Sequence, residues 1–313
     1  MRIAGTSYTQ SMTSQINSLA AQQFRLQNQA TTGQSIQAPE DDPAGMAQAL
    51  GLQAQSSTVG QYAQNVATLQ NRSSLVGNAL QQLKTITDRV NELATQSDGI
   101  SSPDQLRANA SETTQLIQQA VQVLNSKDGD QYLFGGTASS QPPFVAATDA
   151  NGNVTGVTYQ GNDSVTENEV GQNSTVTVDI PGENTSGSGA RGLVSDSRYG
   201  ADLFGHMISL QNHLLAGDTN SISTVDQPAL SKDDDNILYQ VSNNGAVQAR
   251  LEVAASTAST QQSGLAASLN NVAGADLTQT LTQLTQAQNA YQIALQSSST
   301  ILQLKTSLLS YLQ

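Results

Sequence analysis

The sequence predicts an elongated α+β protein in which long, coiled-coil-like helices from both ends of the chain form a bundle and a β-rich insert occupies the middle. Three observations lead to this fold class. Apolar residues recur with heptad spacing towards both ends. Between residues 137 and 229 the pattern changes to β-branched residues alternating with polar ones. Hydrophobic residues make up only 37% of the 313 residues, which suits polar helices with narrow apolar seams.

The first predicted element is a helix that fills most of residues 1–40. Met12, Ile16 and Leu19 begin a weak apolar stripe at helical spacing. Gly33 is expected to end this helix, since glycine adopts the left-handed conformation of a C-cap without strain. An acidic pair precedes Pro43, which predicts an N-cap and a first helical turn there.

Three further seams predict a helical bundle domain from residues 41–136 and 230–276. One seam runs from Val59 to Ala94 and resumes from Leu106 to Leu124, after a Ser-Ser-Pro-Asp loop at residues 101–104. Another runs from Val247 to Leu265. Heptad spacing of this kind is typical of helices that pack against one another in a bundle.

The C-terminal helix, predicted over residues 277–313, carries the longest seam. Within one chain, only the weak stripe near the N-terminus is available to cover it. We therefore predict that residues 1–40 and 277–313 form a terminal helical segment for subunit assembly. Its contact residues are Met12, Ile16, Leu19, Leu281, Leu284, Tyr291, Leu295, Leu302, Leu309 and Leu312.

Residues 137–229 are predicted to form an exposed, β-rich domain. Its strands are short and are separated by Asn/Gly turns, and a helix is expected over residues 201–217. Residues 130–235 contain 14 acidic and 3 basic side chains, whereas residues 1–129 contain 9 and 7, and residues 236–313 contain 2 and 2. An acidic middle argues against a nucleic-acid partner, which would need a basic face.

An aromatic cluster marks the passage from the bundle into the insert. Tyr132, Phe134 and Phe144 lie close together in a chain with only 4% aromatic residues. Gly135 and Gly136 sit between them and permit a sharp change of backbone direction. We predict a structural corner in which the aromatic side chains are buried and hold the turn.

The sequence indicates no enzyme, with no catalytic, cofactor-binding or metal-binding residues. There is no Cys, and the two histidines, His206 and His213, are seven residues apart without a third ligand nearby. The N-terminal stretch lacks the apolar core of a cleavable secretory signal. No apolar run approaches the length needed to span a membrane, so no membrane insertion is expected.

Residues 16–50, with a TG turn and a DDP segment, resemble the N-terminal region that flagellins share with hook–filament junction proteins of the bacterial flagellum. YLFGG followed by PPF, TYQGND at residues 158–163 and the final LLSYLQ are similar to the junction-protein family, the third hook-associated proteins. The resemblance implies a secreted structural protein at the hook–filament junction, needed for filament attachment and motility.

The same resemblance implies the partners and the route of the protein. It implies a ring of copies of this chain that contacts a larger hook-associated protein on one side and flagellin on the other. It also implies an export chaperone and passage through the flagellar type III channel. The absence of Cys fits export as an unfolded chain, since no disulfide could obstruct it.

Two alternatives stay open. A filament flagellin would share the architecture of the terminal helices, and self-assembly of the purified protein into long filaments would favour it. A secreted adhesin would use the acidic insert to bind a ligand or surface. Deletion of the insert would then abolish attachment to the surface and leave motility intact.

Overall fold

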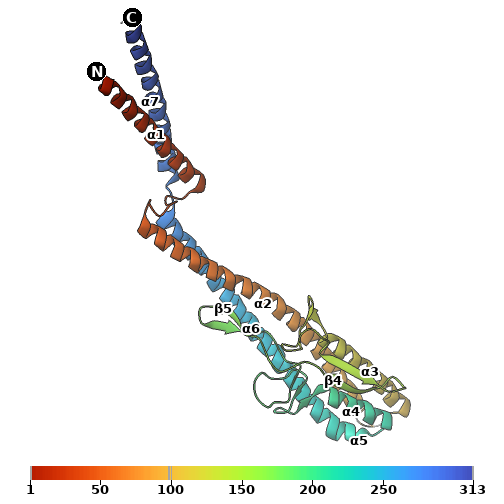
Figure 1. Cartoon of the computed structure of the whole chain (residues 1–313). Coiled ribbons are helices and arrows are strands. Elements are labelled where there is room, and N and C mark those ends of the chain that lie inside the picture. Colours follow the sequence, from red (N-terminus) through yellow and green to blue (C-terminus); the bar gives the residue numbers. More distant parts are fainter. Residues whose placement is uncertain (1, 98, 100, 312–313) are drawn as a thin grey trace. The chain divides into compact units, whose positions relative to one another are not determined.

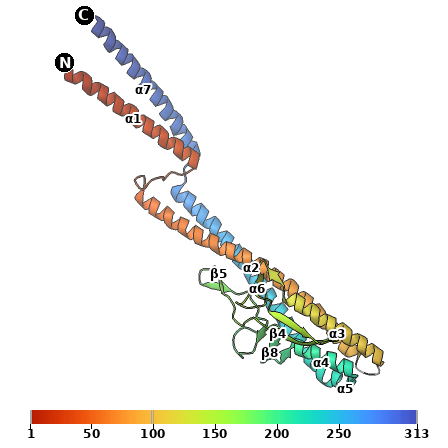
Figure 2. The ribbon, with the colours of Figure 1, turned by 45° about the vertical axis from the view of Figure 1, so that its right-hand side comes forward.

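The structure is a computed structural model that describes the backbone over residues 2–97, 99 and 101–311, and the side chains over residues 9–97, 99, 101–301 and 303. The chain divides into two compact units. The first contains residues 1–58 and 260–313, and the second contains residues 59–259. Figures 1 and 2 show the elements of each unit.

The first unit is built from the two ends of the chain. Helices α1 (Arg2–Thr32) and α7 (Leu277–Tyr311) pack against each other and run antiparallel (Figure 1). The unit also contains the beginning of α2 (Pro43–Gln96) and the end of α6 (Gln227–Ala273). The long helices predicted at both ends are therefore present.

Backbone hydrogen bonds join the end of α1 to the segment between α6 and α7. Gly33 has a φ of 70°, which is the left-handed cap that the sequence predicts. The Ser35 amide donates to the Ala273 carbonyl at 2.7 Å, and the Ala275 amide donates to the Gly33 carbonyl at 2.9 Å. A small core of Ile36, Ala49 and Ala273 lies beside these bonds.

The N-terminus of α2 is capped by the second of the two predicted acids. Asp42 Oδ1 accepts hydrogen bonds from the amides of Ala44 (3.1 Å) and Gly45 (3.0 Å). These amides have no partner within the helix, so the carboxylate satisfies donors that would otherwise be left unpaired. The predicted start of the helix at Pro43 is confirmed.

The second unit contains most of α2 and α6, helices α3 (Pro103–Leu124), α4 (Leu203–Ala216) and α5 (Thr219–Ser221), and the π-helical turn η1 (Ile222–Asp226). Its strands are short: β1 (Lys127–Asp128), β2 (Gln131–Tyr132), β3 (Phe144–Thr148), β4 (Val154–Tyr159), β5 (Asn168–Gly171), β6 (Ser174–Val176), β7 (Glu183–Asn184), β8 (Ser195–Asp196) and β9 (Ala201–Asp202). They form three antiparallel pairs, β1–β2, β3–β4 and β5–β6, and a small sheet in the order β7-β8-β9. In that sheet β8 runs parallel to β7 and antiparallel to β9.

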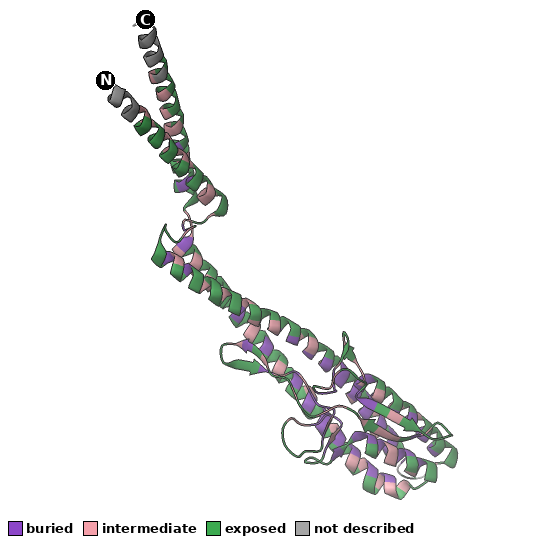
Figure 3. Cartoon of the chain, in the orientation of Figure 1, coloured by how far each residue is buried: buried purple, intermediate pink, exposed green. Residues whose placement is uncertain are grey.

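The larger of the two hydrophobic clusters described in the second unit joins its helices to its strands, and Figure 3 shows buried residues on both. The heptad positions Leu80, Leu83 and Ile117 are buried in it, as the seams predict. Side chains of the middle region, such as Phe144 and Met207, belong to the same core. The core therefore continues across the predicted boundary at residue 137, and the division into three domains stays a prediction.

A polar layer interrupts the apolar contacts between α2 and α6. The Ser73 hydroxyl donates to Asn244 Oδ1 at 2.8 Å, and Asn244 Nδ2 donates to the Ser73 carbonyl at 3.2 Å. Both residues are buried. A buried polar pair in a coiled-coil seam favours the one register in which both groups are satisfied. The predicted α+β fold, with long helices from both ends and a small β-rich middle, is confirmed.

Candidate functional site

The predicted corner lies where the chain leaves α3 and the β1–β2 hairpin. Gly136 has a φ of 62°, a conformation that favours glycine. Gly135 is required for a different reason, because a Cβ there would lie 2.7 Å from the Ala138 carbonyl oxygen. Both glycines are buried, so the turn is enclosed by the fold.

Phe134 is fully buried at this turn, and its backbone is held by two donors. The Tyr159 hydroxyl lies 3.0 Å from the Phe134 carbonyl oxygen, and the Gly182 amide donates to the same oxygen at 3.1 Å. Burial raises the pKa of Tyr159 to about 12. The hydroxyl therefore keeps its proton at neutral pH and remains a hydrogen-bond donor.

Phe144 anchors the other side of the corner. Its ring packs against Tyr159 at 5.1 Å and against Phe204 of α4 at 5.7 Å between centroids. Asn125, at the C-cap of α3, binds the Phe144 backbone twice: its Nδ2 donates to the carbonyl at 2.8 Å, and its Oδ1 accepts from the amide at 3.0 Å. These two hydrogen bonds fix the beginning of β3 against the C-terminus of α3.

Tyr132 differs from the two phenylalanines. It is half-buried, and the Lys127 ammonium lies 4.4 Å from the centre of its ring. The two residues are partners in the β1–β2 register. Tyr132 therefore covers the hairpin next to the corner, where a cation–π contact stabilises it.

Gly136→Ala is expected to destabilise the second unit by roughly 2–4 kcal/mol, from left-handed strain and overpacking together. A Cβ at this position would lie 2.3 Å from the Asn162 carbonyl oxygen and 2.9 Å from that of Ser164. Chemical denaturation measures the loss. Gly129→Ala is the matched control, because Gly129 has a φ of 60° but no atom within 4 Å of the point where a Cβ would lie. Equal losses in both variants would contradict the role given to close packing.

The predicted assembly residues of the first unit divide by exposure. Met12, Ile16 and Leu19 on α1, and Leu284 and Tyr291 on α7, are half-buried. Leu281 and Leu295 are 53% and 43% exposed. The predicted residues Leu302, Leu309 and Leu312 lie outside the described side chains.

Few side chains are fully covered where α1 meets α7. Leu26, Thr280 and Ala287 are the buried side chains among those described on these two helices. Two further apolar residues, Phe24 (66%) and Ile293 (64%), are exposed and were not among the predicted contacts. Exposed apolar side chains gathered on two helices are typical of a surface that another molecule covers.

The two histidines each bind a buried aspartate, which explains their seven-residue spacing without a metal. His206 Nδ1 lies 2.7 Å from Asp233 Oδ2, and His213 Nδ1 lies 2.7 Å from Asp226 Oδ2. Both aspartates are about 1% exposed. Within the described residues, no group of three or more His, Asp or Glu side chains is arranged to hold a metal ion.

The stability of the second unit is expected to fall as the pH rises through the pKa of His206. The hydrogen bond to Asp233, with the nearby charges of Asp202 and Asp226, raises this pKa above its usual value. A histidine with a raised pKa in the folded state adds stability below about pH 6.5 and loses it above its folded pKa. Urea unfolding of the wild type and His206→Gln between pH 5.5 and 8.5 tests this. The variant should show a flatter dependence, and an unchanged slope would overturn the assignment.

None of the helices in the described part of the chain combines the length and the apolar character needed to cross a membrane.

Residues 3–139 match the bacterial flagellin N-terminal helical region. The resemblance indicated by residues 16–50 is therefore confirmed. Flagellar hook-associated protein 3 of Salmonella typhimurium is 29% identical over 143 residues, which are 45% of this chain and 45% of that protein. The match thus spans less than half of this curated relative.

Solved structures extend the likeness in fold over more of the chain. A flagellar hook-associated protein from Vibrio parahaemolyticus aligns over 75% of this chain and 100% of its own, with a TM-score of 0.63 and 15% identity. Xanthomonas campestris FlgL aligns over 69% of this chain and 98% of its own, with a TM-score of 0.56 and 20% identity. At such identities the likeness concerns the fold.

Proposed function

We propose that this chain, which carries the flagellin N-terminal helical region and has the fold of flagellar hook-associated proteins, is a structural subunit of the hook–filament junction of the bacterial flagellum. It acts outside the cell, where it attaches the filament to the hook side and is needed for motility. It performs no catalysis. Its work is to hold neighbouring subunits in place.

The observation that carries this proposal is the helical pair α1–α7. Helix α1 lies in the region that matches the flagellin N-terminal helical region, and α7, from the other end of the chain, leaves apolar side chains exposed. Leu281 and Leu295 on α7 are only about half covered by the chain itself. Burying such side chains between subunits contributes about 25 cal/mol per Å² of apolar area. Assembly is therefore the process that these helices favour.

The proposed neighbours are other copies of this chain in a ring, a larger hook-associated protein and flagellin. An export chaperone is proposed to bind the chain before it passes through the flagellar type III channel. The name and fold of the relatives support these partners. The exposed apolar side chains of α1 and α7 are the surfaces proposed to meet them.

A deletion strain tests the proposal. Cells without this protein are expected to build hooks but no filaments, to release flagellin into the medium and to be non-motile. Expression of the wild-type chain should restore filaments. Attached filaments in the deletion strain would contradict the proposal.

Electron microscopy of the purified protein separates the junction subunit from a flagellin. A junction subunit is expected to remain short of filament length, because its assembly ends with the ring. Long filaments formed by the protein alone would instead identify it as the filament subunit.

A further inference from the structure

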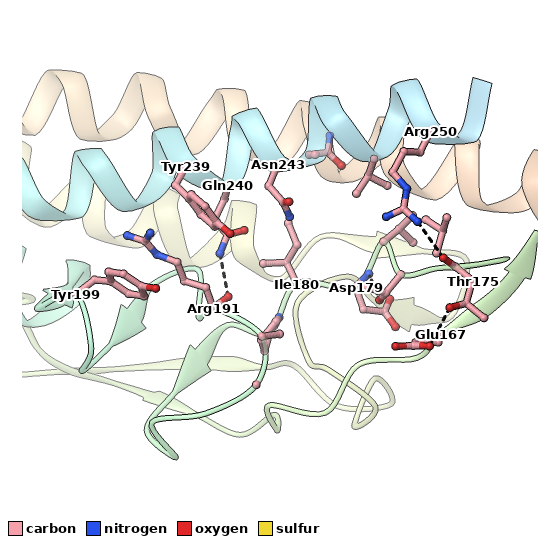
Figure 4. A pocket seen from close by; sticks show the side chains of 18 of the residues that line it. Glu167, Thr175, Asp179, Ile180, Arg191, Tyr199, Tyr239, Gln240, Asn243 and Arg250 are labelled. Carbon is pink, nitrogen blue, oxygen red and sulfur yellow. Dashed lines mark hydrogen bonds between the residues drawn. The ribbon is translucent and has the colours of Figure 1, made fainter. Parts of the chain in front are cut away.

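We infer that a groove in the second unit is a binding site for an extended, acidic segment of a partner protein. The groove has a volume of about 400 Å³ and lies between α6 and the loops that follow β6 and precede β8 (Figure 4). This inference goes beyond the proposed function and does not depend on it. All residues that line the groove belong to the second unit.

The groove concentrates positive charge in an acidic chain. Arg191, Arg198 and Arg250 line it, although the chain has 12 basic and 25 acidic residues. Arg198 is neutralised by Asp196 at 2.6 Å. Within the described part of the chain, no carboxylate forms an ion pair with Arg191 or Arg250. Two guanidinium groups are therefore left for a ligand.

Arg191 is held in a defined orientation. Its guanidinium carbon lies 3.6 Å from the centre of the Tyr199 ring and 4.4 Å from that of Tyr239. Its Nε donates to Asn236 Oδ1 at 2.5 Å, and Gln240 Nε2 donates to its carbonyl at 2.9 Å. Among the described residues, none accepts a hydrogen bond from its terminal nitrogens. A stacked guanidinium with a free edge is suited to a carboxylate, which it binds through two parallel hydrogen bonds.

The far end of the groove carries the second cation. Arg250 donates one hydrogen bond, from Nη2 to the Thr175 carbonyl at 3.1 Å, and the rest of its side chain is exposed. The two acidic side chains at this end already have partners within the chain. Asp179 pairs with Arg72 at 3.0 Å, and Glu167 accepts a hydrogen bond from Thr175 at 3.0 Å. Glu167 reduces the positive charge at this end, so Arg191 is the stronger anchor.

The spacing of the two cations favours a peptide over a small acid. The position of Arg191 along α6 is marked by Tyr239, whose ring contacts its guanidinium. Tyr239 and Arg250 are eleven positions apart on α6, or about 16 Å at 1.5 Å per residue. An extended peptide covers that length with about five residues. The exposed amide of Asn243 lies between the two ends (Figure 4), where it can bind a peptide backbone. A nucleic acid is disfavoured, because the net charge of the chain is −13.

Fluorescence anisotropy with a labelled ten-residue peptide of alternating Glu and Ser tests this site. In such a peptide, when it is extended, all the carboxylates lie on one face about 6.6 Å apart, so pairs of carboxylates about 13 Å and 20 Å apart bracket the spacing of the groove. The wild-type chain is expected to bind it saturably at low ionic strength and to bind a peptide with Gln in place of Glu at least roughly tenfold more weakly.

Arg191→Gln and Arg250→Gln should each weaken binding, Arg191→Gln by roughly tenfold or more. Arg107→Gln is the control, since it removes one charge from an exposed arginine of α3 that does not line the groove. If Arg191→Gln does not fold, Arg250→Gln still tests the site, because Arg250 is exposed.

Three results would overturn the inference. These are no saturable binding to the wild type at millimolar peptide, equal affinity for the Glu and Gln peptides, and equal affinity in the Arg250→Gln and Arg107→Gln variants. Binding of an oligogalacturonate but not of the Glu peptide would also overturn it and would indicate an acidic carbohydrate instead.

Discussion

Phe134→Ala is expected to lower the free energy of unfolding by about 3–5 kcal/mol, the usual cost of truncating a fully buried phenylalanine. The loss combines the apolar area removed from the core with the cavity that remains. That cavity would lie beside a turn whose glycines and backbone hydrogen bonds leave little room to collapse. Urea denaturation followed by circular dichroism measures the change.

The neighbouring aromatic residue provides the control for Phe134. Tyr132→Ala is expected to cost clearly less, since Tyr132 is half-buried and its ring contacts the flexible Lys127 side chain. If Phe134→Ala changed stability by less than about 1 kcal/mol, the side chain would have to be exposed in solution. Phe134 would then be better explained as a contact with a neighbouring subunit.

The corner could be predicted from the sequence because its central residues are close together in the chain. Phe134, Gly135 and Gly136 are consecutive, and their composition alone indicates a buried turn. Their partners could not be predicted in the same way. Tyr159 lies 25 residues from Phe134 and binds a backbone carbonyl, and this contact produces no periodic pattern in the sequence. The signal that was available was TYQGND, which contains both Tyr159 and Asn162.

The strands were harder to predict than the helices. β-Branched residues alternate with polar ones over residues 164–170 and 174–180, but β5 and β6 include only the later part of the first stretch and the beginning of the second. β6 ends at Val176, before Asp179, whose side chain has partners elsewhere. Its Oδ2 accepts from the Thr166 amide and its Oδ1 pairs with Arg72. Arg72 lies 107 residues from Asp179, and a contact over such a separation leaves no pattern in the sequence.

The heptad seam of α7 predicted an apolar stripe but not which residues α1 would cover. Leu284 and Ala287 face the α1–α7 contact, whereas Leu281 and Leu295 lie on its flank and are exposed. A straight helix has 3.6 residues per turn and drifts by about 20° per heptad from a 3.5-residue repeat. One seam can therefore serve a partner within the chain and a second partner outside it.

Leu281→Asp together with Leu295→Asp is expected to abolish filament attachment while the isolated protein unfolds almost as the wild type does. Both side chains are about half exposed in the single chain, where a polar substitution costs little. In the proposed assembly they are buried, and an unpaired buried carboxylate costs several kcal/mol. Complementation of the deletion strain with the variant, followed by electron microscopy of the hooks, measures attachment. Thermal unfolding measures the stability of the monomer.

Gln286→Asp separates the loss of apolar contact from the effect of an added charge. It introduces a carboxylate on the same helix, at an exposed polar residue that lies about 140° around the axis from Leu281. This control should restore filaments and motility. Filaments attached by the leucine double variant would refute the assembly role of this face, and equal failure of Gln286→Asp would assign the defect to charge on α7. Because Leu26, Thr280 and Ala287 are the few buried side chains described on the two helices, contacts with neighbours are expected to supply much of their stability.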